Sequence, residues 1–63
     1  MSKFTIFRCK PIDRQGIVEI CAEDIQSIRP LSSESFIVDY YDDEYCINDT
    51  LFCSKVEAEI IEI

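Results

Sequence analysis

The stretch SFIVDYYDDEYCIND, residues 35–49, decides the fold, because apolar and polar side chains alternate on both sides of an Asp-Asp pair. Alternation with a period of two is typical of β-strands, and a short polar break between two such runs indicates a β-hairpin. A two-residue turn at Asp42 and Asp43 gives a simple register. The facing pairs are then Tyr41 and Glu44, Tyr40 and Tyr45, Asp39 and Cys46, and Val38 and Ile47.

The alternation also gives the hairpin one apolar and one acidic face. The apolar face, which is expected in the core, holds Phe36, Val38, Tyr40, Tyr45 and Ile47. The opposite face holds Ile37, Asp39, Tyr41, Glu44, Cys46 and Asn48. Asp-Asp forms a poorer turn than Asn-Gly because its second residue must also accept a positive φ, so a four-residue loop over residues 41–44 is the alternative.

The chain before this hairpin predicts two further strands and one interruption. Residues 3–10 form a strand that ends at Pro11, and residues 13–16 have the composition of a turn with the only glycine at its end. Residues 16–21 form a second strand. Residues 22–25 predict a single helical turn or a bend, after which Ile25 and Ile28 enter the core and the chain becomes extended again. Residues 31–34 are a polar connection into the hairpin.

The C-terminal region allows two interpretations. Asp49 is a candidate N-cap for a short helical piece over residues 50–54, with Leu51 and Phe52 turned inward. Residues 55–63 fit both the strand and the helix period, and we prefer a strand paired with residues 3–10. Opposite charges favour that pairing, because bases lie on the first strand and acids on the last. These residues are Lys3, Arg8 and Lys10, and Glu57, Glu59 and Glu62.

These elements predict a single mainly β domain over residues 1–63, with α+β as an alternative class. We expect a small antiparallel sheet or partly closed barrel of four to five strands with a short helical turn. The 63 residues carry thirteen acids and six bases, a net charge of −7, and residues 30–63 hold nine of the acids but one base. Phosphate binding needs clustered Lys and Arg, so direct nucleic-acid binding is disfavoured and a basic protein surface is the expected partner.

The residue types argue against catalysis and against cofactors. The sequence has no His, no glycine-rich phosphate loop and no nucleophile beside a base, so we expect no enzyme activity and no cofactor. Four cysteines would suffice for a zinc shell, but they lack the paired spacing of structural zinc sites, and no metal is expected. The N-terminal residues show no signal peptide and no membrane span occurs. A cytoplasmic protein with free thiols is therefore predicted.

The acidic face of the hairpin is the candidate site. We predict partner contacts by Asp39, Asp42, Asp43 and Glu44, with Tyr41 as the packing anchor, because Tyr is enriched at protein interfaces. The leading hypothesis is a protein-binding inhibitor that mimics nucleic acid and blocks the basic site of a DNA- or RNA-handling protein, as small viral and mobile-element proteins do. The alternative is a structural or regulatory module that self-associates, as a homodimer for example, or joins a complex through an apolar sheet surface with Ile61, Ile63 and residues near Phe7. On that alternative the acids only keep the domain soluble.

Overall fold

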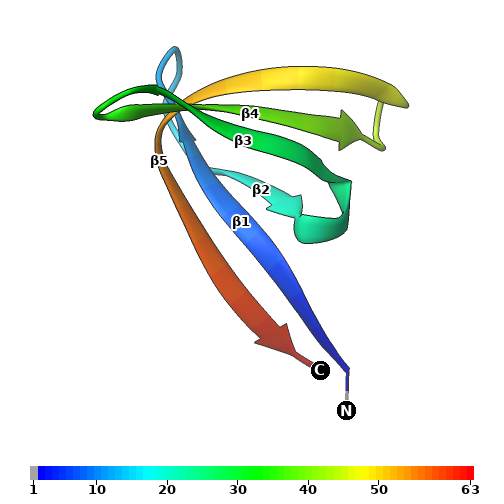
Figure 1. Ribbon diagram of the computed structural model, residues 1–63. Coiled ribbons are helices and arrows are strands. Elements are labelled where there is room, and N and C mark those ends of the chain that lie inside the picture. Colours follow the sequence, from blue (N-terminus) through cyan, green and yellow to red (C-terminus); the bar gives the residue numbers. More distant parts are fainter. Residues whose placement is uncertain (1) are drawn as a thin grey trace.

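The computed structural model describes residues 2–63 and forms one antiparallel sheet (Figure 1). Its five strands lie in the order β2-β1-β5-β4-β3 and do not close into a barrel, since β2 and β3 remain edges. One 3-10 turn, η1, joins these two edge strands. The predicted class, a small mainly β sheet with a short helical turn, is confirmed. The elements are β1 Lys3–Pro11, β2 Val18–Cys21, η1 Ala22–Asp24, β3 Ile25–Ser32, β4 Ser35–Asp42 and β5 Ile47–Glu62.

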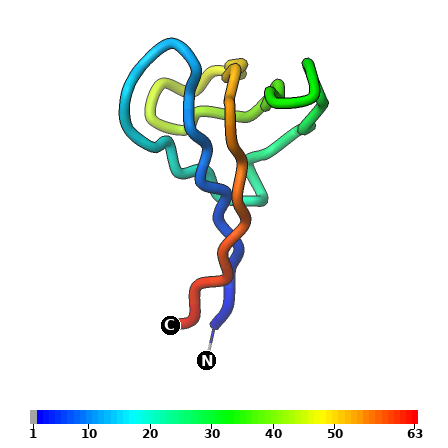
Figure 2. The backbone as a smooth tube through the Cα atoms, turned by 90° about the vertical axis from the view of Figure 1, so that its left-hand side faces the viewer, coloured from blue at the N-terminus to red at the C-terminus, as the bar shows by residue number. Residues whose placement is uncertain are grey.

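The sixteen-residue strand β5 organises the sheet because it has two different partners along its length. Its first half pairs with β4 as far as Cys53, and from Cys53 to Glu62 it pairs with β1. The chain bends between these halves. In Figure 2 the ends of β1 and β5 leave the body as a two-stranded arm with both chain termini at its tip. Backbone hydrogen bonds between Ser2 and Ile63 close this arm.

The predicted pairing of the first and last strands is confirmed. Lys3 lies opposite Glu62 with 3.3 Å between the charged atoms, and Arg8 forms ion pairs with Glu59 and with Glu19 of β2. The helical piece predicted for residues 50–54 is wrong, because these residues continue β5. A helix would turn Leu51 and Phe52 to one side, whereas the strand buries Leu51 and leaves Phe52 half exposed.

The hairpin exists, but its register differs from the prediction by four residues. Val38 faces Leu51 rather than Ile47, and Asp42 faces Ile47. The loop therefore covers residues 43–46, so neither the two-residue turn nor the loop over residues 41–44 forms. A two-residue turn would need a positive φ at two successive Asp residues, while this loop needs it at Cys46, whose φ is 55°.

The core fills the concave side of the sheet. Its buried side chains come from four strands and are Cys9, Ile20, Val38, Tyr40, Leu51 and Cys53. Phe7, Val18, Ile25 and Val56 pack against them. Three further residues expected inside are exposed, Tyr45 because it lies in the loop, Ile47 because it lies at the loop end of the hairpin, and Ile28 because it lies on edge strand β3.

The connections follow the residue types at each position. Gly16 has a φ of 98°, as expected for the only glycine of the chain in the turn between β1 and β2. The connection before the hairpin is shorter than predicted, since β3 continues to Ser32 and leaves residues 33 and 34 as the turn. No helix within residues 2–63 has the length and apolar character that crossing a membrane requires.

Candidate functional site

The hairpin loop lines an acidic groove of about 270 Å³, which lies between the loop and edge strand β2. The groove brings together residues from β2, η1 and β4 with the loop that follows β4. Five of its lining residues are carboxylates and none is a base. They are Glu19, Asp24, Asp42, Asp43 and Glu44. Four of the five predicted partner contacts line this groove, Asp39 being the exception, and Glu19 and Asp24 join them from elsewhere in the chain.

The loop conformation fixes how these acids are presented. The Glu44 backbone N–H donates a hydrogen bond to Asp42 Oδ1 at 3.0 Å, which is the local turn that Asp side chains commonly stabilise. Within residues 2–63, no Lys or Arg nitrogen lies within ion-pair distance of Asp24, Asp42, Asp43 or Glu44. Glu19 is different, because Arg8 Nε lies 3.0 Å from its carboxylate. Four carboxylates of the groove thus have no ion-pair partner among residues 2–63.

Two tyrosines form the aromatic wall of the groove. Tyr41 is 38% exposed, as expected for a contact residue, while Tyr40 is buried in the core. The pKa of the Tyr41 phenol is raised. The largest cause is a hydrogen bond with the Cys46 thiol, and desolvation and the nearby carboxylates contribute less. Asp43 and Asp24 are among these carboxylates, so the negative field reaches the ring from both the loop and η1. The arrangement suits a cation placed against an aromatic face.

Asp39 has a different environment from the other predicted contacts. It lies on the convex side of the sheet, where it accepts hydrogen bonds from Ser27 Oγ at 2.7 Å and Thr50 Oγ1 at 2.8 Å. Arg29 lies at 2.8 Å from the same carboxylate. The Ser27 and Thr50 hydrogen bonds, with the charge and hydrogen bond of Arg29, lower the pKa of Asp39. This carboxylate ties β3, β4 and β5 together, and it is the least available of the five for a partner.

Sequence reasoning missed Glu19 and Asp24 as members of the groove. They lie 24 and 19 residues before Asp43, the first residue of the hairpin loop, and neither stands in a motif. The only available signal was indirect, since residues 22–25 were predicted as a helical turn or a bend. Glu19 and Asp24 lie beside the loop because β2 and η1 line the same groove as the end of β4.

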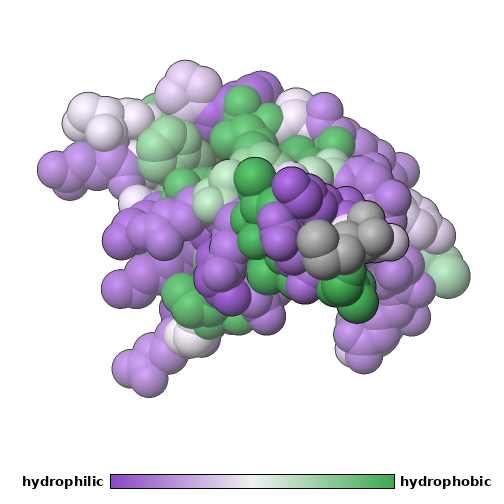
Figure 3. Space-filling view, turned by 90° about the horizontal axis from the view of Figure 1, so that it is seen from below, coloured by the Kyte–Doolittle hydropathy of each residue, from purple (hydrophilic) through white to green (hydrophobic). Residues whose placement is uncertain are grey.

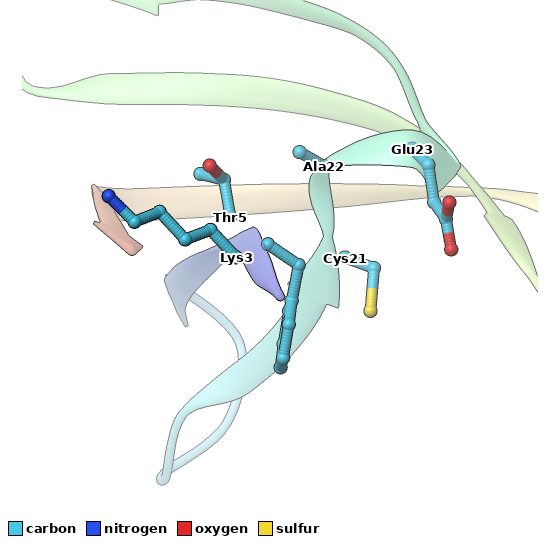
Figure 4. Close-up of a pocket in the computed structure, with 6 residues that line it drawn as sticks. Lys3, Thr5, Cys21, Ala22 and Glu23 are labelled. Atoms are coloured by element: carbon cyan, nitrogen blue, oxygen red, sulfur yellow. The ribbon is translucent and has the colours of Figure 1, made fainter. Parts of the chain in front are cut away.

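A second groove, of about 370 Å³, lies beside the arm (Figure 4). Lys3 and Thr5 come from β1, Cys21 ends β2, and Ala22 and Glu23 belong to η1. In Figure 4 the Lys3 side chain extends away from Cys21 and Glu23, and it is already paired with Glu62. The polar groups therefore do not converge on one point, which a catalytic site would require.

The cysteines occupy two kinds of environment. Cys21 and Cys46 are exposed, while Cys9 and Cys53 lie together in the core, where burial and the neighbouring Cys53 raise the pKa of Cys9 to about 12. Thiols with a raised pKa are poor nucleophiles and poor metal ligands. Among residues 2–63, no three His, Cys, Asp or Glu side chains are grouped so that they could hold a metal ion.

Comparison with protein-family models, curated proteins and solved structures finds no match to this chain. The fold alone does not define a function, since small β-sheets serve many unrelated ones. The charge and geometry of the acidic groove are therefore the features that bear on its function.

Proposed function

We propose that this protein is a non-enzymatic binding module that captures a basic segment of another protein in its acidic groove. The observation that supports this proposal is the set of four carboxylates without an ion-pair partner among residues 2–63, gathered from η1, β4 and the hairpin loop. Like charges held close together raise the free energy of the unbound protein. A Lys or Arg side chain in the groove would relieve this repulsion and form charge-assisted hydrogen bonds.

An arginine fits the groove better than a lysine. Its planar guanidinium can bind a carboxylate through two parallel hydrogen bonds while its face lies on an aromatic ring. Asp42 or Asp43 would supply the carboxylate, and the half-exposed Tyr41 would supply the ring. The groove volume of about 270 Å³ has room for a side chain but is small for a folded element. The partner would therefore present a flexible or protruding basic segment.

The most specific form of the proposal is an inhibitor that mimics nucleic acid. Proteins that bind DNA or RNA carry clustered Lys and Arg, and their affinity for phosphates depends on these charges. A compact surface with closely spaced carboxylates competes for the same cations. This form of the proposal places the protein in the cytoplasm, beside DNA- or RNA-handling proteins, with a viral or mobile-element source.

Binding to an immobilised arginine-rich peptide tests the groove directly. The triple variant Asp42→Asn, Asp43→Asn, Glu44→Gln is expected to lose most of the binding that the original protein shows at low salt. The original protein should also lose affinity steeply as salt rises, because the contacts are electrostatic. The three substitutions leave every buried side chain in place, so the thermal unfolding midpoint should change little.

A control variant separates the groove from net charge. Asp13→Asn, Glu34→Gln, Glu62→Gln also changes the net charge from −7 to −4, but these residues lie in two other turns and at the tip of the arm. This control is expected to keep most of the affinity. Equal losses in both triple variants would mean that the peptide responds to overall charge, and the proposed site would be rejected.

A further inference from the structure

The longest open strand edge within residues 2–63 belongs to β5. Beyond Cys53 this strand has β1 on one side, while β4 ends its pairing at Cys53 on the other side. Residues 54–62, which we call the free edge, therefore lack a neighbouring strand on that side. Figure 1 shows this half of β5 with β1 beside it and no other strand beyond it. Open edges of this length offer unpaired backbone groups to another strand.

The hydrogen-bond pattern identifies which backbone groups point toward the open side. Ser2 and Ile63 exchange both N–H···O bonds, with N···O distances of 3.2 and 2.9 Å. Bonded pairs alternate along an antiparallel ladder, so Ile61, Glu59 and Glu57 also bond to β1. The residues between them direct N–H and C=O away from β1. On the free edge these residues include Val56, Ala58 and Ile60.

The same three residues carry apolar side chains on one face of β5. Val56 packs partly against the core, Ala58 is exposed, and Ile60 is 67% exposed. Figure 3, viewed from the side of the chain termini, shows apolar patches between hydrophilic atoms. Unsatisfied backbone groups and uncovered apolar side chains thus occur together on one edge. Both are satisfied if a second strand pairs there.

We propose that the second strand is β5 of another copy of this chain, paired antiparallel about a two-fold axis at Ala58. This register places Ala58 opposite its own copy and Val56 opposite Ile60 of the other copy, twice. The row of apolar side chains is then continuous across the interface. An axis at Glu57 or Glu59 would instead place identical carboxylates opposite each other and would bring Ser54 or Glu62 against the apolar row. The sequence of the edge therefore matches itself best at Ala58.

The charges on the other face of β5 are compatible with this pairing. Glu57 comes opposite Glu59 of the other copy, but each carboxylate already has a cation beside it. Lys55 Nζ lies 2.7 Å from Glu57, and Arg8 forms an ion pair with Glu59. Each copy thus contributes two positive and two negative charges, and this part of the interface is neutral. The whole molecules still repel each other, because each carries a net charge of −7.

That repulsion gives the dimer a salt dependence opposite to that of the groove. Salt screens the repulsion between two acidic copies, so the dimer should become more stable as salt rises. Binding of a basic segment in the groove should become weaker over the same range. The dimer does not depend on the proposed function, and the variant with Asp42, Asp43 and Glu44 neutralised should still form it.

Sedimentation velocity over a wide concentration range tests whether the dimer forms. The original protein is expected to shift from monomer to dimer with concentration, and the variant Ile60→Lys should remain a monomer. Ile12→Lys is the matched control, since Ile12 is also exposed, at 54%, but lies beyond β1 at the other end of the molecule. A protein that stays monomeric at all concentrations and salt levels, or an Ile60→Lys variant that dimerises normally, would overturn the proposal.

Cross-linking tests the register after Cys21 and Cys46, the exposed thiols, are replaced by Ser. In that background Ala58→Cys should form a disulfide dimer with oxidised glutathione, which accepts the two electrons and two protons that the thiols release. Facing Cα atoms in a bonded pair are about 5.5 Å apart, within disulfide reach. Ser54→Cys is the control, because its copy lies eight residues away along the pair, about 27 Å. Equal cross-linking at both positions would overturn the register.

Amide hydrogen exchange provides a test without substitutions. The N–H groups of Val56, Ala58 and Ile60 should exchange more slowly as the protein concentration rises, because the second copy covers them. The N–H groups of Glu57 and Glu59 already bond to β1, so their exchange should change much less. The same change in both sets, or no change in the first set, would contradict pairing along this edge.

Discussion

Leu51 and Phe52 are neighbours in β5 whose truncation should have very different effects on stability. Leu51 is 4% exposed and lies on the concave side with Val38 and Tyr40, while Phe52 is 49% exposed on the convex side. We therefore expect Leu51→Ala to lower the free energy of unfolding by about 2–5 kcal/mol, the usual cost of a cavity left by a buried leucine. Phe52→Ala should cost about 1 kcal/mol, because half of its ring is already in water.

The size of the first effect matters for a protein this small. At about 0.05–0.15 kcal/mol per residue, a 63-residue domain has a total stability of about 3–9 kcal/mol. Leu51→Ala would then remove a large part of it and could leave the chain largely unfolded. The milder Leu51→Val, expected to cost about 1 kcal/mol, keeps the comparison measurable.

Urea unfolding followed by circular dichroism and tyrosine fluorescence measures these differences, with the slope of the transition as a check on two-state behaviour. The reasoning depends on strand geometry, which sends successive side chains to opposite faces. A helix over residues 50–54 would bury both side chains. If Phe52→Ala destabilises the protein as much as Leu51→Ala, the strand assignment and its register would be refuted.

Three further predictions concern the cysteines, Asp39 and Gly16. A thiol reagent should modify the native protein at the exposed Cys21 and Cys46, and it should spare the buried Cys9 and Cys53 until the protein unfolds. The reason is that these two thiols are buried and that the pKa of Cys9 is raised to about 12. Mass spectrometry of the modified protein would show which thiols have reacted, and early modification of the buried pair would contradict the prediction. The pKa of Asp39 is lowered from its ordinary value of 3.8 in the folded state, so its contribution to stability is present above that value and is lost as the pH falls through the lowered pKa. In thermal unfolding, Asp39→Asn should therefore lose less stability in acid than the original protein. Parallel curves of unfolding midpoint against pH for the two proteins would reject this linkage. Gly16→Ala should cost about 1 kcal/mol through its φ of 98° alone, because nothing lies within 4 Å of the added Cβ, and a thermal midpoint unchanged by the substitution would show that this turn adapts freely.

Local pattern predicted most of the extended segments, although it wrongly assigned residues 50–54 to a helical piece. Alternation and the single Gly16 correctly indicated the first two strands, the turn between them and the strand before the hairpin loop, while residues 22–24 form the helical turn, which was one of two alternatives predicted for residues 22–25. Charge added one tertiary contact, since the bases near the N-terminus and the acids near the C-terminus do lie on paired strands. These features are local or depend on gross charge, so a single sequence carries them.

The register of the hairpin could not be obtained in this way. The observed register differs from the predicted one by four residues, and any even shift keeps every side chain on its face, so alternation cannot distinguish the two. Packing decides between them. The observed register places Leu51 and Cys53 of β5 opposite Val38 and Phe36, and it completes the core. The predicted register would have used Tyr45 and Ile47, which are exposed instead.

The sequence by itself determined the mainly β character of this protein, its acidic charge and the acids of its hairpin, because these follow from residue type and short-range alternation. Tertiary structure decided that Asp39 is held by Ser27, Arg29 and Thr50, and that Asp24 joins Asp42 in the groove. It also decided that β5 bends from one partner strand to another and leaves its second half open. Such features depend on which distant strands meet, and that is determined by burial of the whole core.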